Sequence, residues 1–337
     1  MRRVAFFINR IGKNTCREIF LHFFGTIITR GAPLKARKEE QTMQDYVLAT
    51  CSTADISKEE MEEYGAEYVK FSYYVNGVEY KDDLGQTQPH GEFYQMMRQG
   101  CDTKTSQPNM EAYKEFLSPI LSRGKDVILL NLSSGLSGAQ ASAKMAEKEL
   151  KAEFPERKIY VVDSLGASSG MGLLLDKMAS LKKEGMSIDE LYAWTENNKL
   201  KVHHWFFSTD LSFYVKGGRI SRVAGWFGTI LKICPLLNVD RNGKLVPREK
   251  IRGKNAVINQ IVKKMEENAL DGTAYRGKCF ISHSACLEDA ESVAKLIEER
   301  FPNLDGEVKI NSIGTTIGAH TGPGTVAVFF FGKERND

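Results

Sequence analysis

The sequence has few cysteines, and no two of them are spaced as a metal-binding or redox pair. The six are scattered along 337 residues without a CxxC motif, at Cys16, Cys51, Cys101, Cys234, Cys279 and Cys286. Zinc sites usually show closely spaced cysteine or histidine pairs, and disulfide frameworks occur in short, cysteine-dense chains, so neither is indicated. The pattern favours reduced thiols in a cytoplasmic protein.

Other absences narrow the class of protein further. No apolar run reaches the roughly 18–20 residues that cross a bilayer. The glycine signatures of P-loop and Rossmann nucleotide sites are missing, and no His/Cys/Asp/Glu cluster has metal-ligand spacing. We therefore expect no integral membrane segment, no cofactor and no metal.

Positive charge is concentrated at one end of the chain. Residues 1–42 carry nine lysines and arginines against three glutamates, whereas the remainder has 37 basic and 40 acidic side chains. The body of the protein is thus mildly acidic despite the net charge of +3. This distribution argues against a general nucleic-acid-binding function.

Residues 1–42 do not share the pattern of the rest. Basic residues separate two apolar runs, at 4–8 and 19–28. The first run is too short for a signal peptide and no small-residue cleavage site follows it. A basic amphipathic segment at a membrane surface is a second interpretation. The interpretation we favour is that Met43 is the natural start and that residues 1–42 are a leader or disordered extension.

The central stretch, residues 126–150, predicts a strand, a small-residue turn and a helix. Val127–Leu132 is an almost unbroken apolar run, typical of a strand buried on both faces of a parallel sheet. The turn Ser133–Gly138 leads into a helical pattern. Backbone N–H groups at such a helix start favour a phosphate or carboxylate. The alternative is an ordinary turn whose serines only cap the helix.

The chain is long enough for two domains, and its pattern changes near residue 200. Apolar strands alternate with helices over residues 43–200, which predicts a parallel-sheet α/β domain. Asn-Gly hairpins at Asn76-Gly77 and Asn242-Gly243 are predicted in the first and second halves. Residues 201–337 mix a hairpin with helices, one of them expected at Arg222–Leu231, and predict an α+β domain.

Four polar turns are candidates for a ligand site: Cys51–Asp55, Lys104–Pro108, Ser133–Gly138 and Ser164–Gly170. All except Lys104–Pro108, expected as an exposed turn, directly follow predicted strands, where ligands bind in open α/β sheets. Together they predict a hydroxyl-lined pocket for an anion.

One of these turns also fits a catalytic pattern. Gly166-Ala167-Ser168-Ser169-Gly170 matches G-x-S-x-G, the nucleophile elbow of serine hydrolases. Asp240 and His283 or His320 follow in the order that such enzymes use. However, an elbow serine belongs at the tip of its strand, whereas here Ser164–Gly166 intervene. A serine hydrolase using Ser168 is therefore the alternative enzyme hypothesis.

Two further residues are candidates for contact with an anion. His320 lies in a stretch of three glycines and one proline, Ile317–Thr325, which is expected to be a tight loop beside the last strand. Its imidazole is suited to binding or positioning a phosphate or carboxylate. Arg252 is the second candidate, with a solvated surface arginine as the alternative.

Seven landmarks, in order from about Met43 to Gly332, resemble the DegV family of bacterial proteins. They are Ser52-Thr53-Ala54-Asp55, Lys104–Pro108, Ser133–Gly138, Asp163–Ser168, Lys216-Gly217-Gly218-Arg219-Ile220-Ser221, Lys250-Ile251-Arg252-Gly253 and Ile317–Thr325. Residues 1–42 lie outside the resemblance.

The resemblance implies two α/β domains with a long-chain fatty acid in the cleft between them. Relatives of this type are non-catalytic binding subunits that present the acyl carboxylate to a separate ATP-binding fatty acid kinase subunit. By analogy, Thr105 and a serine of the 133–137 turn hold the carboxylate, with Ser134 as first choice beside Ser133 and Ser137. Arg252 and His320 would serve phosphoryl transfer or partner docking near the head group.

One departure from the family pattern concerns Cys51. The family usually has an aspartate directly before the Ser-Thr-Ala-Asp landmark, and this sequence has Cys51. The loss of a carboxylate alters the local hydrogen bonds and bears on kinase-partner competence more than on fold or lipid binding. A lipid or small-carboxylate sensor without a kinase partner is therefore a further alternative.

Overall fold

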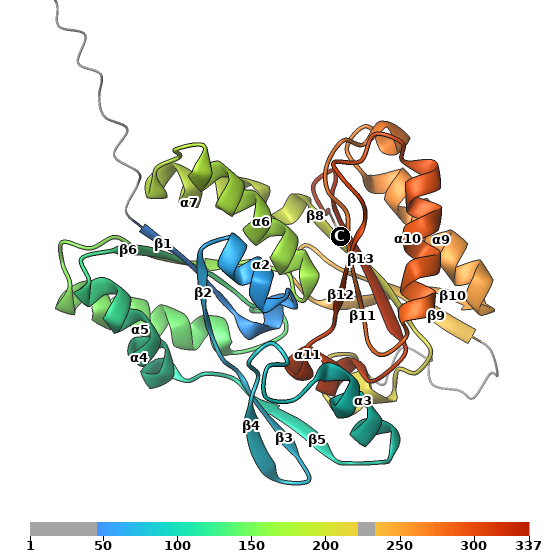
Figure 1. Ribbon diagram of the computed structural model, residues 1–337, viewed down its shortest axis with the longest axis horizontal. Helices are drawn as coiled ribbons and strands as arrows, with labels where there is room; N and C mark the ends of the chain where they lie inside the picture. Colours follow the sequence, from blue (N-terminus) through green and yellow to red (C-terminus); the bar gives the residue numbers. More distant parts are fainter. Residues whose placement is uncertain (1–45, 222–232, 337) are drawn as a thin grey trace, which may run out of the picture. The chain divides into compact units, whose positions relative to one another are not determined.

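The computed structural model describes residues 46–221 and 233–336, and residues 43–337 form one compact unit. Its described part consists of three β-sheets and the helices around them (Figure 1). The expected leader at residues 1–42 and the expected helix Arg222–Leu231 lie outside the described residues. Within the two described ranges, every helix is too short or too polar to cross a bilayer.

The first sheet consists of four parallel strands in the order β2-β1-β6-β7. Their bounds are Tyr46–Cys51 for β1, Ala66–Val69 for β2, Asp126–Asn131 for β6 and Ile159–Asp163 for β7. Residues 127–130 are completely buried, as expected of a strand covered on both faces. The predicted parallel sheet is confirmed.

Helices cover both faces of this N-terminal sheet (Figure 1). One face carries α4 (Met110–Ser122) and α5 (Ala139–Glu153), and the other carries α6 (Ser169–Lys183) and α7 (Ile188–Asn198). The short α2 (Lys58–Glu63) connects β1 to β2. Both α2 and α7 begin at a capping box, in which a serine and the glutamate three residues later exchange hydrogen bonds with each other's backbone.

The second sheet is a small antiparallel sheet of three strands, β4-β3-β5, and it corrects one expectation. Its strands are β3 (Ser72–Val75), β4 (Val78–Lys81) and β5 (Thr103–Ser106), with α3 (His90–Arg98) before β5. The predicted hairpin at Asn76-Gly77 is present, with positive φ at both residues. The expected turn Lys104–Pro108, by contrast, is largely strand, because β5 pairs with β3.

The third sheet has six strands in the order β10-β9-β8-β13-β11-β12, mostly antiparallel, with β11 and β12 parallel. The strands are β8 (Val202–Ser208), β9 (Ile233–Val239), β10 (Leu245–Arg252), β11 (Phe280–His283), β12 (Lys309–Ser312) and β13 (Thr325–Phe331). Helices α9 (Lys254–Asn268) and α10 (Leu287–Arg300) cover one face. The mixture of helices and antiparallel strands is the predicted α+β half.

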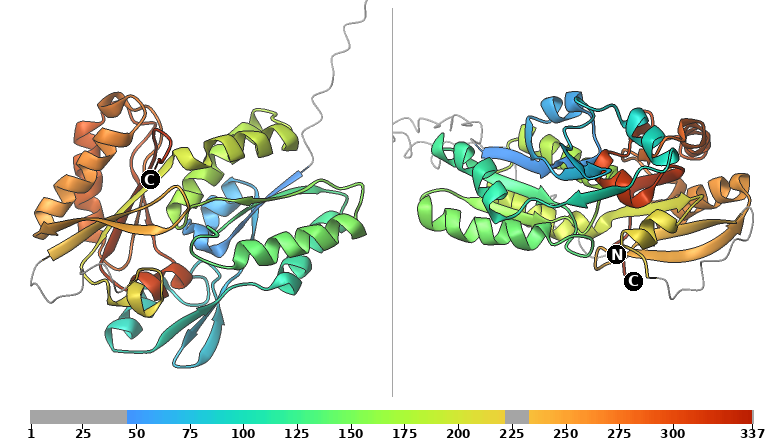
Figure 2. Two further views of the ribbon diagram at one scale, coloured as in Figure 1. Left: turned by 180° about the vertical axis from the view of Figure 1, so that it is seen from behind. Right: turned by 90° about the horizontal axis from the view of Figure 1, so that it is seen from below.

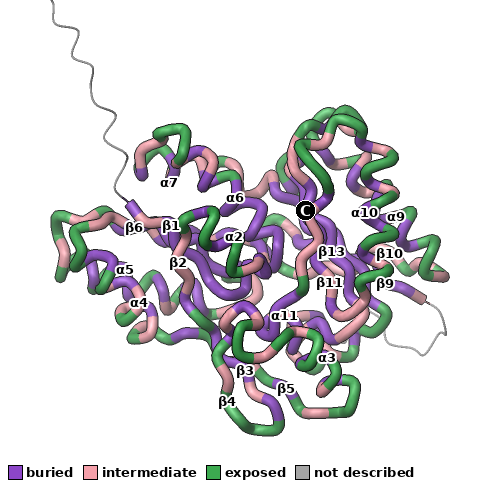
Figure 3. Tube along the Cα trace, in the orientation of Figure 1, coloured by how far each residue is buried: buried purple, intermediate pink, exposed green. Residues whose placement is uncertain are grey.

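The other face of this C-terminal sheet packs against the N-terminal half. Along β8, Trp205 and Phe207 belong to the core under α9 and α10, whereas Phe206 belongs to the core shared with the N-terminal sheet. Side chains on both faces of the sheet are therefore buried. Nearly all residues of β8, β11 and β13 belong to the buried class, and Figure 3 shows the burial of the chain residue by residue.

Helix α6 joins the two halves by packing across β8, β11 and β13 (Figure 2). Glycine makes this close approach possible, because a Cβ at Gly170 would lie 2.2 Å from His204 Nε2. Farther along α6, the buried carboxylate of Asp176 accepts a hydrogen bond from Lys278 Nζ at 2.7 Å. The expected arrangement of two α/β halves is thus present. The boundary between residues 200 and 201 stays a prediction.

Candidate functional site

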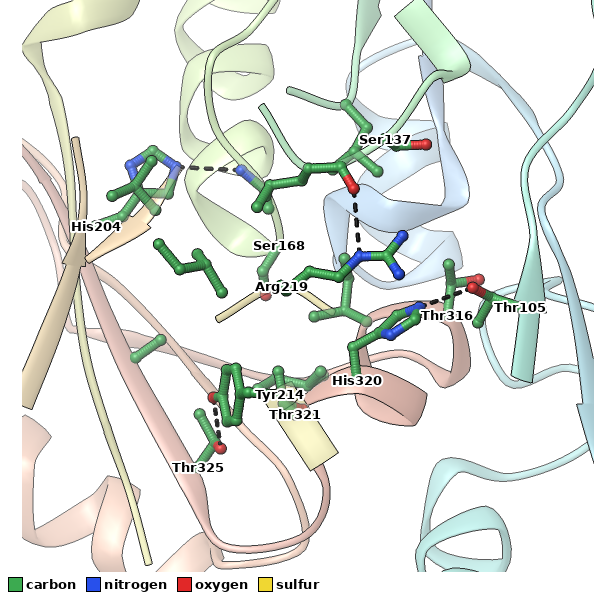
Figure 4. Close-up of a pocket in the computed structure, with 18 of the residues that line it drawn as sticks. Thr105, Ser137, Ser168, His204, Tyr214, Arg219, Thr316, His320, Thr321 and Thr325 are labelled. Carbon is green, nitrogen blue, oxygen red and sulfur yellow. Dashed lines mark hydrogen bonds between the residues drawn. The ribbon is translucent and has the colours of Figure 1, made fainter. Parts of the chain in front are cut away.

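A cavity of about 330 Å³ lies where the N-terminal βα turns, the small sheet and the C-terminal sheet meet. Most of its wall is apolar and is formed by Phe71, Leu132, Leu136, Phe206, Val239, Leu245, Ile313, Ile317, Ala327 and Phe329. The volume lies in the range of small-molecule sites. Polar groups are gathered at particular places in this wall (Figure 4).

The largest polar group combines a threonine, a histidine, an arginine and the turn after β6. Thr105 Oγ1 lies 2.7 Å from His320 Nε2, and Ser137 Oγ donates a hydrogen bond to Gln107 Oε1 at 2.8 Å. Arg219 lies beside them, and its guanidinium is directed toward His320 (Figure 4). Hydroxyl, imidazole and guanidinium groups converging at one end of an apolar cavity form a suitable site for a carboxylate.

His320 is held as a neutral imidazole. It lies in the last turn of α11 (Thr315–Thr321), a short helix where the sequence predicts a tight loop, so that expectation was wrong. Burial, and next the Arg219 charge, lower the pKa of His320 from 6.5 to about 4. Its Nδ1 is buried without a hydrogen-bond partner. A Cβ at Gly217 would lie 2.3 Å from this Nδ1, so only glycine leaves room for the ring.

Arg219 is a half-buried cation that follows the short helix α8 (Ser212–Lys216). Its Nη1 donates to Gly217 O at 2.6 Å and its Nε donates to Leu136 O at 3.3 Å, which fixes the guanidinium plane. Among the described residues, no carboxylate lies within ion-pair distance of it. A positioned cation without an anionic neighbour favours an anionic ligand.

A separate group of polar side chains is formed by His204 and Ser168. His204 is buried and neutral, because burial holds the pKa of its imidazole well below 6.5. Its Nδ1–H donates to Val202 O at 3.1 Å, and its Nε2 accepts from the Ala167 N–H at 3.4 Å. His204 lies far from Thr105 along the cavity (Figure 4). It therefore marks the end opposite the cation.

Ser168 is not arranged as the nucleophile of a serine hydrolase. Its Oγ donates to Asp55 Oδ2 at 2.5 Å and lies 2.9 Å from Ser282 Oγ. Within the described residues no histidine is hydrogen-bonded to it: His320 contacts Thr105, and His283 Nδ1 accepts from the Cys286 N–H. The elbow mechanism needs a histidine base beside the serine hydroxyl.

The structure brings some of the predicted site residues together and separates others. Thr105, Ser137 and His320 line the cavity. Ser133 is buried elsewhere, with its Oγ donating to Gly243 O at 2.8 Å, and Ser134, the first choice from the sequence, is exposed. Neither of these two lines the cavity, because the turn directs Ser137 inward instead.

Arg252 and Arg219 differ from the sequence expectations in opposite ways. Arg252 is exposed at the end of β10 and does not line the cavity. Arg219 does line it, although its landmark Lys216–Ser221 received no role in the sequence analysis. A basic residue directly after two glycines was the available signal, because such a turn brings the backbone close to a ligand.

Cys51 acts on the cavity only indirectly. It is fully buried at the end of β1, where its Sγ donates to Asn131 Oδ1 at 2.7 Å, and burial raises the pKa of its thiol to about 12. Asn131 Oδ1 also accepts from the N–H of Leu132, a residue of the cavity wall. The thiol therefore supports the start of the turn after β6 without touching a ligand.

The lowered pKa of His320 predicts an acid-sensitive contribution to stability. The unfolded state takes up a proton near pH 6.5 and the folded state only near pH 4, so stability falls as the pH drops through this window. In urea unfolding, we expect the free energy of unfolding of the wild type to fall by about 2 kcal/mol more than that of His320→Gln between pH 7 and pH 5. An equal fall in both proteins would contradict the lowered pKa of His320.

Comparisons with known proteins agree on one family. A sequence model of the DegV family matches residues 47–333. The chain is 36% identical over 293 residues to the DegV domain-containing protein CPE0026 of Clostridium perfringens, covering 87% of this chain and 99% of that protein. It is 26% identical to the structure of DegV, a fatty acid binding protein from Bacillus subtilis, with a TM-score of 0.72 and coverage of 86% and 100%.

A third comparison extends the likeness of fold. The Fak B3 protein of the Streptococcus pneumoniae fatty acid kinase, loaded with linoleic acid, superposes with a TM-score of 0.73 at 19% identity, covering 87% of this chain and all of that one. At this identity the likeness shows a shared fold.

Proposed function

The chain belongs to the DegV family, and from that premise we propose that it binds a long-chain fatty acid and presents its carboxylate to a separate ATP-dependent kinase subunit. The observation that carries the proposal is the cavity itself. It is apolar over most of its wall and has a positioned cation, Arg219, at an end that also holds Thr105, Ser137 and His320. This matches the chemistry of a molecule with a long hydrocarbon tail and a single anionic head.

The tail would supply most of the affinity. Burying about fourteen methylenes of a sixteen-carbon acid contributes roughly 11 kcal/mol before ordering costs, at about 0.8 kcal/mol each. Two or three hydrogen bonds to the carboxylate add roughly 1.5–3 kcal/mol apiece. Affinity is therefore set mainly by the apolar wall, and orientation by the polar end.

At the polar end, Thr105 would donate its hydroxyl hydrogen bond to the carboxylate, and Arg219 would pair with its charge. Ser137 would add a second hydroxyl hydrogen bond once its Oγ turns from Gln107 Oε1 to the ligand. His320, neutral at pH 7, would donate its Nε2–H to Thr105 Oγ1 across the 2.7 Å contact, which leaves the Thr105 hydroxyl hydrogen free for the carboxylate. Ser133 and Ser134 are less suited, since they lie outside the wall of the cavity. The exposed Arg252 is available for contact with a partner.

The kinase subunit is proposed because the chain has no phosphate-binding glycine signature of its own. Its fold is also that of the Fak B3 protein. On this proposal the protein is a non-catalytic carrier, and the transfer of phosphate from ATP takes place on the partner. If the protein is instead a sensor without such a partner, bound acid will stay unmodified when a kinase subunit from the same genome and ATP are added.

Native mass spectrometry of the purified protein, followed by extraction of the bound lipid, tests the binding step. We expect one fatty acid per chain, or its uptake when oleate or palmitate is added to emptied protein. A protein that is isolated empty and takes up neither acid would overturn the proposal.

A further inference from the structure

Helix α11, which carries His320, is held at its other end by two buried carboxylates from the N-terminal half. Asp55 Oδ1 accepts from the Gly314 N–H at 3.0 Å. Asp82 Oδ2 accepts from the N–H and the hydroxyl of Thr316, at 3.2 and 2.6 Å. These N–H groups belong to the helix start, where no intrahelical acceptor exists and a carboxylate is favoured.

The two carboxylates meet at one glycine. A Cβ on Gly314 would lie 2.8 Å from Asp55 Oδ1 and 3.7 Å from Asp82 Oδ2, so both side chains approach the same point of the backbone. Tyr94 adds a third contact, since its hydroxyl donates to Ile313 O at 2.8 Å. The start of α11 is thus fixed from the N-terminal half, although α11 itself leads into the C-terminal sheet (Figure 1).

The opposite end of α11 reaches the polar end of the cavity. His320, in its last turn, contacts Thr105 on β5, and Thr316 and Ile317 line the cavity wall. Because α11 has only seven residues, a displacement of its first turn is carried to His320. The position of the imidazole therefore depends on the contacts at the helix start.

Asp55 also fixes a second part of the wall. It accepts the 2.5 Å hydrogen bond from Ser168, a cavity residue whose φ of 56° and ψ of −153° lie in a region that costs energy for residues other than glycine. Such a conformation persists only when neighbouring contacts impose it. One carboxylate thus holds both the helix start and the strained serine.

We propose that Asp55 and Asp82 are positioning residues, which hold α11 so that His320 meets Thr105 at the polar end of the cavity. Neither aspartate lines the cavity. The inference rests on the proposed function only in taking that end as the place where the carboxylate binds. It also gives a role to Asp55, the last residue of the Ser-Thr-Ala-Asp landmark.

The burial of both aspartates supports their role in holding helix α11. Asp55 is 3% exposed and Asp82 is 1% exposed, and in the described part of the chain neither forms an ion pair. Buried carboxylates without a cation are costly unless hydrogen-bond donors compensate them. Burial raises the pKa of Asp55 well above its ordinary value, and the Asp82 charge adds to this. A neutral amide should therefore replace Asp55 with little disturbance.

The ring signals of His320 in ligand-free protein provide the test. Long-range ¹H–¹⁵N spectra would be recorded for wild type, Asp55→Ala, Asp82→Ala and the rescue variants Asp55→Asn and Asp82→Asn, with His320 assigned from His320→Gln. Asp176→Ala is the matched control, because Asp176 is also a buried carboxylate that joins the two halves, through Lys278 and away from α11.

We expect both alanine variants to shift the His320 ring signals and to raise its pKa from about 4 by at least about one unit, as the ring gains solvent. The oleate Kd should rise roughly three- to tenfold. The asparagine variants and Asp176→Ala should resemble wild type. If an alanine variant fails to fold, Asp55→Glu or Asp82→Glu displaces the carboxylate by one methylene and should shift the same signals.

Unchanged His320 signals in folded alanine or glutamate variants would overturn the proposal, as would an equal shift in Asp176→Ala. A wild-type protein that binds no oleate would instead contradict the proposed function. The ring spectra need no ligand, so the two failures are distinguishable.

Discussion

Replacing Ala327 with phenylalanine is expected to weaken oleate binding about a thousandfold. Ala327 lies on β13, where Thr325, Ala327 and Phe329 face the cavity and the residues between them face the core under α9 and α10. A phenyl ring at this position would occupy space that the acyl chain needs. Excluding about five methylenes at about 0.8 kcal/mol each costs roughly 4 kcal/mol, which corresponds to that change in Kd.

Isothermal titration of emptied protein with oleate measures the effect of Ala327→Phe. Ala327→Val is the matched control, because valine removes much less volume from the cavity. Loss of contact with about one to two methylenes should weaken its oleate affinity only about four- to fifteenfold. Thermal melting of both variants confirms that they are folded. If folded Ala327→Phe binds oleate as wild type does, the acyl chain does not run along this wall.

The regular elements were predictable because their signals are local. The apolar run at 127–132 predicted a buried parallel strand, and Asn76-Gly77 and Asn242-Gly243 predicted the hairpins that join β3 to β4 and β9 to β10. Each signal depends on residues that are neighbours in the sequence, so tertiary contacts did not override it.

The elements that the sequence did not predict are stabilised by distant parts of the chain. Strand β5 has the sequence Thr-Lys-Thr-Ser, without an apolar residue, and forms by pairing with β3, some thirty positions earlier. Helix α11 contains Gly318 and three threonines, which are poor helix formers, and its start depends on Asp55 and Asp82. Thr105 and His320, which the sequence analysis selected for their polar character, nevertheless line the same cavity.

The same reasoning explains the uncertain choice among the serines of the turn. Ser133, Ser134 and Ser137 have equal chemistry, and only the backbone path decides which hydroxyl faces inward. The path is set by contacts with the C-terminal half, such as the hydrogen bond from Ser133 to Gly243. Arg219 escaped notice for a similar reason, since its guanidinium reaches the cavity only after α8 packs beside α11.

Replacing Arg219 with leucine should abolish the preference of the protein for an acid over the corresponding alcohol. Arg219 is the cation at the polar end, and a charged hydrogen bond to it contributes roughly 1.5–3 kcal/mol, so the oleate Kd should rise by about ten- to a hundredfold. Oleyl alcohol has the same tail without the charge, and its affinity should change little.

The comparison of these two ligands separates loss of charge recognition from loss of the cavity. Lys216→Ala is the matched control, because Lys216 lies three residues before Arg219, is exposed, and pairs with Asp102 outside the cavity. It should leave the affinity for both ligands unchanged.

When a kinase subunit and ATP are added, Arg219→Leu should reduce acyl phosphate formation by a larger factor than it reduces oleate binding, because transfer depends on the position of the carboxylate. Equal weakening of oleate and oleyl alcohol binding in Arg219→Leu would show that the carboxylate lies elsewhere, and would leave Arg219 as a residue that only supports the wall through Leu136 and Gly217.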